Sequence, residues 1–164
     1  MTAKTGAPTP AVAALVLAGI PHTLHSYEHD PDSDLGYGLE APAAIGVEPT
    51  RVFKTLCVEA DGRLSVGIVP VDSSLDLKAI ARALGAKAAS MAKPADAERA
   101  TGYVVGGISP LGQKRALPTV VDESALLFDT VYVSGGRRGL DVGLAPRDLI
   151  AATGASLAPI ARRD

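Results

Sequence analysis

Two strand-like apolar segments joined by an Asp-Gly pair constrain the fold of this chain more than any other feature. Residues 51–59 and 64–71 are rich in β-branched and other apolar side chains, which favour pleated strands. Asp61 and Gly62 lie between the two segments, and this dipeptide accepts the positive φ angles of a tight hairpin turn. The sequence therefore predicts an antiparallel pair of strands, around which the other elements pack.

The rest of the chain predicts short strands that alternate irregularly with helices. Thr9 and Pro10 predict the start of a helix that Gly19 ends, and further helices are expected at residues 39–45, 76–84, 94–99 and 146–153. Further strands are expected at residues 22–29, 86–91, 119–122, 130–134, 140–144 and 156–160. This order predicts an α+β (mixed α/β) fold, with a barrel-like, mostly antiparallel mixed sheet surrounded by helices. No linker or repeat divides the chain, so residues 1–164 are expected to form a single domain.

Charge and composition restrict how this chain can meet a partner. The formal net charge is −2, whereas proteins that bind nucleic acid mainly by neutralising phosphates carry a clear basic excess. Any contact with RNA is therefore expected at a local patch, and the basic pairs beside glycine-rich segments are Lys114–Arg115 and Arg137–Arg138. The apolar stretch at residues 11–20 is too short to span a bilayer, and one cysteine allows no internal disulfide. These features predict a cytoplasmic protein with no membrane partner.

The histidines are the only side chains that invite a metal-binding interpretation. The sequence has no cysteine–histidine cluster with zinc spacing, no Walker A segment and no G-x-S-x-G motif. His22, His25 and His29 are close in sequence, but on a strand only His25 and His29 share a face, about 13 Å apart. That separation is too long for one ion, so solvated or hydrogen-bonded histidines are expected. We predict no metal and no cofactor.

Lys54 is unusual because it lies in the middle of the first predicted hairpin strand. Lysine is rarely buried without a partner, since its charge loses hydration. From composition alone, a lysine on a solvent-facing side of the strand is the simpler interpretation. The alternative is a lysine that points into a pocket, toward a substrate carbonyl, phosphate or carboxylate. Cys57 lies on the opposite face and is expected to be a small core residue, because no histidine is placed to activate it.

Two glycine-rich segments, residues 101–112 and 134–139, are the other unusual features. Glycines permit positive φ angles and let a ligand approach the backbone, and successive N–H groups can form an anion-binding concavity. Either segment alone is equally well explained as a hairpin turn. Because both occur in one small chain, and Arg137 and Arg138 lie within one of them, they favour a binding site for an anionic ligand.

Four segments in this order resemble the YbaK family, the free-standing relatives of the editing domain inserted in bacterial prolyl-tRNA synthetases. They are residues 25–30 (HSYEHD), 52–56 (VFKTL), 102–112 (GYVVGGISPLG) and 133–140 (VSGGRRGL). The similarity runs over most of the chain, and four motifs in register are highly specific. It implies a pocket that receives the aminoacylated 3′ end of tRNA, with Lys54 as the functional lysine. By the same matching Tyr27, Thr55, the backbone of Gly106 and Ser134 would line that pocket, and Asp141 is carried over more weakly because relatives vary there.

The resemblance also implies a reaction. The most similar members of the family act on Cys-tRNA(Pro), and related branches prefer alanine or serine esters. Because the sequence offers no evident Ser/His or Cys/His nucleophile, the resemblance suggests that the substrate thiol attacks its own carbonyl and leaves as a cyclic thiolactone. A non-catalytic module that binds tRNA or a synthetase is the alternative from another class. The net charge of −2 makes tight unaided tRNA binding doubtful, so a transient complex with prolyl-tRNA synthetase is expected.

Overall fold

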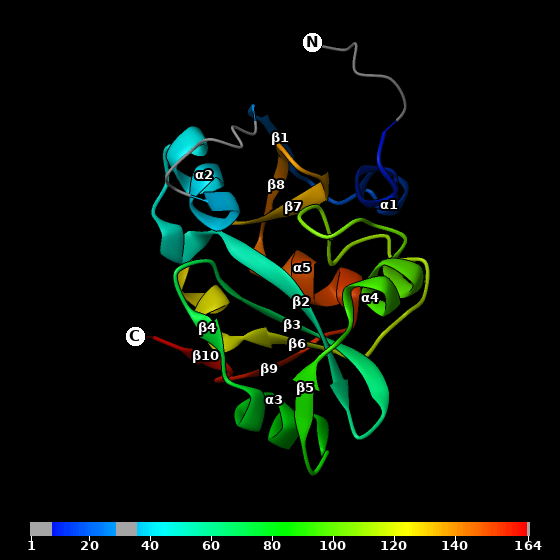
Figure 1. The fold of residues 1–164 in the computed structure, drawn as a ribbon. Coiled ribbons are helices and arrows are strands. Elements are labelled where there is room, and N and C mark those ends of the chain that lie inside the picture. The colour runs from blue at the N-terminus through cyan, green and yellow to red at the C-terminus, as the bar shows by residue number, and fades with distance from the viewer. Residues whose placement is uncertain (1–7, 29–35, 164) are drawn as a thin grey trace.

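The hairpin predicted around Asp61 and Gly62 is the centre of the largest sheet in the computed structural model, which describes residues 8–28 and 36–163. Strands β2 (Phe53–Ala60) and β3 (Arg63–Pro70) pair antiparallel over their whole length, from Phe53 opposite Pro70 to Ala60 opposite Arg63. Asp61 and Gly62 have φ angles of 49° and 83°, the left-handed values that a two-residue turn requires. This prediction is confirmed (Figure 1).

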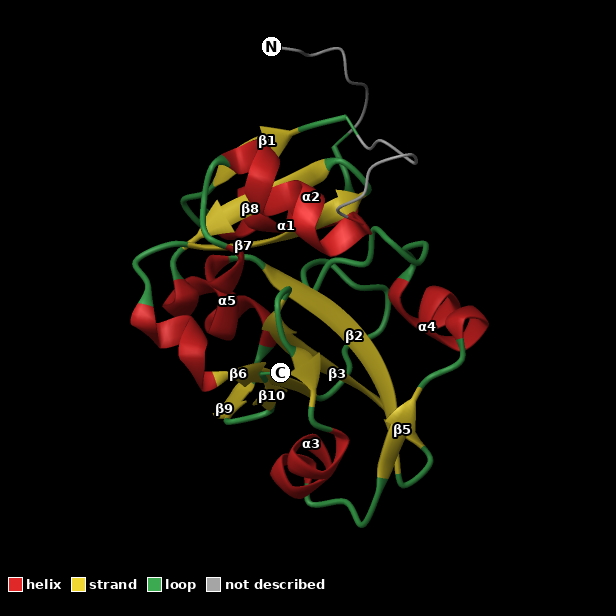
Figure 2. Ribbon diagram, turned by 60° about the vertical axis from the view of Figure 1, so that its left-hand side comes forward, coloured by secondary structure: helices red, strands yellow, loops and turns green. Residues whose placement is uncertain are grey.

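The five-stranded sheet combines antiparallel and parallel pairs. Its order is β5 (Ala89–Met91), β2, β3, β6 (Thr119–Asp122) and β9 (Ser156–Ala158). The pairs on either side of β2 are antiparallel, whereas β3–β6 and β6–β9 are parallel. Helix α3 (Leu77–Leu84) covers one face of the sheet, where Ile80 packs with Val58 and Val69. Figure 2 shows β2 running diagonally between α3 and the elements of the other sheet.

A second sheet of three antiparallel strands has one apolar and one polar face. Its order is β1 (Thr23–Ser26), β8 (Leu140–Leu144) and β7 (Val131–Arg137). Val133 and Val142 are fully buried and belong to the main apolar cluster, which also includes Leu15 of helix α1 (Pro10–Ala18). Because side chains alternate along a strand, the neighbours of these valines point to the other side. An isolated bridge between Val52 and Tyr132 joins the two sheets at one point.

Local signals set the ends of the helices. Thr9 caps α1 with its hydroxyl, which accepts from the amide of Val12, and Gly19 ends the helix in the left-handed conformation. The remaining helices, which were also predicted from the sequence to within a few residues at their ends, are α2 (Gly36–Ile45), α4 (Pro94–Thr101) and α5 (Pro146–Thr153). Within the described ranges no helix has the length and apolar character needed to cross a bilayer.

The mixed α/β fold class is confirmed, with some differences in detail. The described strands form three separate sheets and do not close into a barrel. The third sheet pairs β4 (Ser74–Leu75) with β10 (Ala161–Arg162), which were not predicted because two residues carry no periodicity. In the glycine-rich segment at residues 134–139, β7 continues to Arg137 through an irregularity between Ser134 and Arg137, and the hairpin turn follows at Arg138 and Gly139. The strand expected at residues 22–29 is observed only at Thr23–Ser26, and His29 lies outside the described residues.

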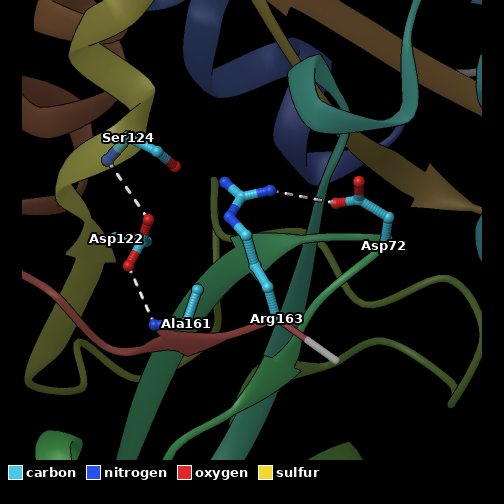
Figure 3. A network of polar contacts seen from close by, with 5 residues as sticks. All are labelled: Asp72, Asp122, Ser124, Ala161 and Arg163. Carbon is cyan, nitrogen blue, oxygen red and sulfur yellow. Dashed lines mark hydrogen bonds and ion pairs between the residues drawn. The ribbon is translucent and has the colours of Figure 1, made fainter.

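A buried carboxylate fastens the end of the described chain to the large sheet. Asp122 is 5% exposed and accepts hydrogen bonds from the amides of Ile160 at 2.9 Å and Ala161 at 2.8 Å, and also from Ser124. These bonds hold β10 in place, and the next residue, Arg163, reaches Asp72 at 4.0 Å (Figure 3). Asp72 lies two residues after the end of β3, whose Val69 pairs with Lys54, so the end of the described chain is tied to the part of the sheet that holds Lys54.

Candidate active-site cavity

A cavity of about 350 Å³ lies between the first half of β2, the glycine-rich loop at residues 104–108 and the polar face of the three-stranded sheet. All six residues predicted for the site line it. The full lining consists of Tyr27, Ala41, Val52, Phe53, Lys54, Thr55, Leu56, Cys57, Val71, Met91, Ala92, Pro94, Ala97, Val105, Gly106, Ile108, Ser134, Arg137 and Asp141. Segments far apart in sequence therefore meet at one place.

The cavity exists because β2 is an edge strand over its first half. Strand β5 pairs only with Val58–Ala60, and the next backbone contact on that side runs from the amide of Ala92 to the carbonyl of Cys57 at 3.0 Å. Side chains on both faces of a strand are accessible from its edge. Consecutive residues of β2, including Lys54, Thr55 and Cys57, consequently line the same cavity.

Lys54 is half-buried, and burial lowers the pKa of its ammonium group below the ordinary value. The negative charge of Asp72 opposes this shift, and Arg163 lies 4.0 Å from that carboxylate. Loss of hydration favours the neutral amine, whereas a nearby anion favours the ammonium. The structure thus places a partly desolvated lysine on the cavity wall, and the pocket interpretation of Lys54 is the one that its position supports.

The wall that faces β2 belongs to the three-stranded sheet, whose neighbouring strands carry a row of polar residues, which we call the polar row: His25, Asp141 and Ser134. Asp141 lies in the central strand β8, with His25 as its partner on β1 and Ser134 as its partner on β7. Asp141 is only 6% exposed. Burial raises the pKa of its carboxyl to about 7, and a hydrogen bond with the Tyr27 side chain partly opposes that rise. Burial also raises the pKa of the Tyr27 phenol, as do the charges of Asp141 and Glu40.

The two glycine-rich segments pack against each other at the rim of the cavity. Gly106 has a φ angle of 95°, which favours glycine. A Cβ on Gly107 would lie 2.8 Å from the Cα of Arg137, so only glycine permits this approach. The Arg138 guanidinium donates to the carbonyl of Val105 at 3.3 Å. Part of the glycine pattern therefore serves loop packing, and Gly106 itself lines the cavity.

Thr55 and Cys57 alternate with Lys54 along β2 and also line the cavity. The Thr55 hydroxyl oxygen is buried and has no hydrogen-bond partner within the part of the chain that the structure describes, which leaves it available to a ligand. Cys57 is 5% exposed and belongs to the main apolar cluster, and burial raises the pKa of its thiol. A buried thiol in apolar surroundings is a poor nucleophile, in agreement with the sequence-based interpretation of Cys57 as a core residue.

The described histidines make hydrogen bonds with the protein. The Nδ1 atom of His22 lies 2.8 Å from the carbonyl oxygen of Ile20, and the Nε2 atom of His25 lies 2.8 Å from the Thr23 hydroxyl. His29 lies outside the described residues. Among residues 8–28 and 36–163, no group of three or more histidine, cysteine, aspartate or glutamate side chains is arranged to hold a metal ion.

Sequence reasoning missed several residues of the cavity. Arg137 lines it; the sequence placed Arg137 in a segment that favours an anionic ligand, but did not include it among the residues of the pocket. Met91 and Val105 are exposed at 51% and 45% and form part of the rim. An apolar residue that lines a cavity has no sequence signal that separates it from a core residue, so these two could not have been found.

Known proteins resemble this chain over most of the residues that line the cavity. Residues 39–152 match the family model described as the aminoacyl-tRNA editing domain. A protein of Enterococcus faecalis, EbsC, described as a candidate Cys-tRNA(Pro)/Cys-tRNA(Cys) deacylase, is 36% identical over 122 residues, which cover 74% of each chain. A proline–tRNA ligase of Acidithiobacillus ferrooxidans is 33% identical over 82 residues, which are 50% of this chain and 14% of the ligase. A solved structure described as a candidate trans-editing enzyme for prolyl-tRNA synthetase superposes with a TM-score of 0.79 at 26% identity, covering 93% of this chain and 95% of the other.

The buried Asp141 carboxyl predicts a specific dependence of stability on pH. Its pKa is raised from 3.8 to about 7 in the folded state, so folding favours its protonated form. The resulting stabilisation is complete below pH 3.8 and is lost as the pH rises through about 7, at about 1.4 kcal/mol per pH unit in between. We expect Asp141→Asn to remove this slope from the free energy of unfolding, measured by urea denaturation between pH 4 and pH 8.

A companion variant tests the cause of the shift. Tyr27→Phe removes the hydrogen bond that lowers the pKa of Asp141, so its stability should fall over a window that extends to higher pH than in the wild type. If Asp141→Asn keeps the wild-type slope, the carboxyl is not buried in the way described.

Proposed function

The chain belongs to the aminoacyl-tRNA editing domain family, and we propose that it is a trans-editing deacylase that removes cysteine from mischarged tRNA(Pro). The observation that carries the proposal is one cavity of about 350 Å³ lined by Lys54, Asp141 and the glycine-rich loops. The name of the Enterococcus faecalis relative supports cysteine as the amino acid. The partial match to a proline–tRNA ligase supports tRNA(Pro) as the carrier.

The need for such an enzyme follows from the limits of binding specificity. Cysteine and proline are similar in size, and a difference of one methylene supports only about 1–3 kcal/mol of discrimination. A synthetase therefore mischarges its tRNA, and a second site must clear the error. A small cavity with both apolar and polar walls suits a short amino acid that carries a polar end, because it gives each part of the side chain a matching surface.

In this proposal the residues on different walls of the cavity have different roles. Lys54 and the backbone amide of Gly106 stabilise negative charge that develops on the ester carbonyl, an interaction that is stronger in a water-poor site than in bulk water. The hydroxyl groups of Tyr27, Thr55 and Ser134 hydrogen-bond the substrate and hold it in place. Asp141 contacts the substrate from the polar wall of the cavity, next to the Tyr27 phenol. No cofactor takes part.

We further propose that the substrate supplies its own nucleophile. The thiol of cysteine gives up its proton, and its sulfur attacks the ester carbonyl and forms a carbon–sulfur bond. The bond between that carbonyl carbon and the ribose oxygen then breaks, the ribose oxygen takes the proton that the thiol gave up and becomes a hydroxyl, and a cyclic thiolactone leaves. The surroundings of Cys57 support a nucleophile that comes from the substrate. The Cys57 thiol is buried and burial raises its pKa, which makes it a poor nucleophile for the ester. Asp141, with a pKa of about 7, is suited to accept the thiol proton near neutral pH.

The domain organisation and the cellular location of the protein follow from the proposed activity. We propose that residues 1–164 act as a single editing domain, and that the protein works in the cytoplasm, where aminoacylated tRNA is used. An alanine- or serine-specific deacylase, or a non-catalytic tRNA- or synthetase-binding module, is the alternative, and the assays below separate these possibilities.

Replacement of Lys54 is the first test of the proposed activity. Lys54→Ala should keep the fold but lose deacylation of Cys-tRNA(Pro) by about 100-fold or more, the magnitude expected when one stabilising donor is removed from a developing oxyanion. Lys78→Ala is a matched control, because Lys78 is an exposed lysine on α3 that does not line the cavity. The rate should be measured on tRNA(Pro) charged with cysteine, alanine and serine. Full activity of Lys54→Ala would contradict the proposed role, and a wild-type preference for alanine or serine would change the substrate.

Modification of the substrate thiol tests the mechanism. We expect tRNA(Pro) charged with S-methylcysteine to be stable in the presence of the enzyme, because its sulfur cannot attack the carbonyl and form a neutral thiolactone. Serine, whose hydroxyl is a weaker nucleophile, should also react slowly. Release of S-methylcysteine at the rate of cysteine would mean that water is the nucleophile and that the self-cleavage step is wrong.

We also propose a transient complex with prolyl-tRNA synthetase that delivers the mischarged tRNA. The net charge of −2 supports weak binding of tRNA by the chain alone. Addition of the synthetase should therefore lower the KM for Cys-tRNA(Pro) and leave kcat nearly unchanged. The measurement is a titration of synthetase at low enzyme concentration, with a synthetase for an unrelated amino acid as control. An equal effect of both synthetases would argue against a specific complex.

A further inference from the structure

A second concavity, of about 500 Å³ and lined mainly by polar and charged groups, lies at the far end of β2 from the active-site cavity. Three arginines line it from three different elements: Arg63 begins β3, Arg99 lies on α4, and Arg115 lies on the loop before β6. The acidic residues in its wall are Glu59 and Asp96. Three cations against two anions give this wall a net charge of +1, whereas the whole chain carries −2.

The charges in this wall are not all used within the protein. Arg99 forms an ion pair with Asp96, one turn away on the same helix. For Arg63 and Arg115, no ion pair or hydrogen bond of the guanidinium group occurs within residues 8–28 and 36–163. Arginine offers a planar set of donors that matches the oxygens of a phosphate. Two such groups facing one polar concavity are therefore available to an anion.

Backbone hydrogen bonds fix the position of these arginines. The amides of Lys114 and Arg115 donate to the carbonyls of Thr101 and Ala100 at 2.9 and 3.0 Å, which attaches the loop to the end of α4. Arg63 follows the tight turn at Asp61–Gly62 and pairs with Ala60 in the ladder of β2 and β3. The side chains of Arg63 and Arg115 thus extend from anchored backbone, which reduces the entropy lost when they bind a ligand.

The two concavities adjoin along the same elements. On β2, Cys57 lines the first and Glu59 the second; on α4, Ala97 lines the first and Ala100 the second. From Lys54 to Glu59 the strand advances about 17 Å. A polynucleotide whose aminoacylated end occupies the first cavity can therefore follow β2 and α4 and bring a preceding part of its backbone to the second.

We propose that this second concavity binds phosphate groups of the polynucleotide strand that leads to the aminoacylated 3′ end, with Arg63 and Arg115 as the main contacts. This inference rests on the proposed deacylase function, because that function defines which end of the strand enters the first cavity. The concavity then explains how a chain of net negative charge engages RNA through a local basic patch.

The test compares the double variant Arg63→Ala/Arg115→Ala with the wild-type full-length chain. Arg147→Ala is the matched control, because Arg147 is an exposed arginine on α5 that lines neither concavity. Three quantities are measured: the KM for Cys-tRNA(Pro), the salt dependence of uncharged tRNA(Pro) binding by fluorescence anisotropy, and the cleavage of the cysteine ester of adenosine, which has no phosphates.

We expect the double variant to raise the KM about fivefold or more and to leave kcat nearly unchanged. The slope of log affinity against log salt should become shallower by about 1.4, which corresponds to two lost phosphate contacts with a single strand. Cleavage of the adenosine ester should equal that of the wild type. The control should match the wild type in all three measurements.

Several results would overturn the proposal. The first is an unchanged KM and salt slope in the double variant. The second is an equal loss of cleavage of Cys-tRNA(Pro) and of the adenosine ester, which would mean that the two arginines serve folding. The third is binding of inorganic phosphate by the wild type together with tRNA binding that the double variant leaves unchanged. A wild-type chain that cleaves no charged tRNA would refute the proposed function instead. In that case the anisotropy measurement still decides whether the concavity binds RNA.

Discussion

The structure depends on how far β2 is paired along its two edges. One edge pairs with β3 over its whole length, and the other pairs with β5 only at Val58–Ala60. The full ladder makes β2 rigid, since every residue is held on one side. The open half of the other edge exposes Lys54 and its neighbours to the cavity. If β5 extended by four residues along β2, that edge would be occupied and the cavity would close.

The three-stranded sheet forms the second wall of the cavity, because one of its faces is apolar and the other is polar. Its apolar face packs Val133 and Val142 into the main cluster, which anchors the sheet against α1. The residues on either side of those valines, Ser134 and Asp141, must then point the other way. Burial of the apolar face thus sets the position of Ser134 and Asp141 on the other face, and Asp141, in the central strand, is only 6% exposed.

The sequence predicted those parts of the fold and the site that depend on local chemistry. The turn at Asp61–Gly62 and the caps of α1 were readable because a few adjacent residues determine them. The strand pairing that brings Asp141 beside Ser134 was not, since register between strands depends on the packing of the whole sheet. The resemblance to a known family supplied six of the residues that line the cavity, but it did not explain why consecutive residues of β2 reach it. That explanation needs the short length of β5, and the convergence of Arg63 and Arg115 likewise needs the folded loop.

Lys54 and Asp141 line one cavity, but neither is a cause of the other's pKa shift. A lysine and an aspartate that served only the fold would pair, and pairing would raise the pKa of the lysine and lower that of the aspartate. Both groups move the other way, and burial is the largest cause in each case. Neither group therefore owes its pKa shift to pairing with the other, although both line the same cavity. Ionisable groups with shifted pKa values in one cavity are typical of a site that binds or transforms a ligand, and they are the physical reason to propose this cavity as the active site.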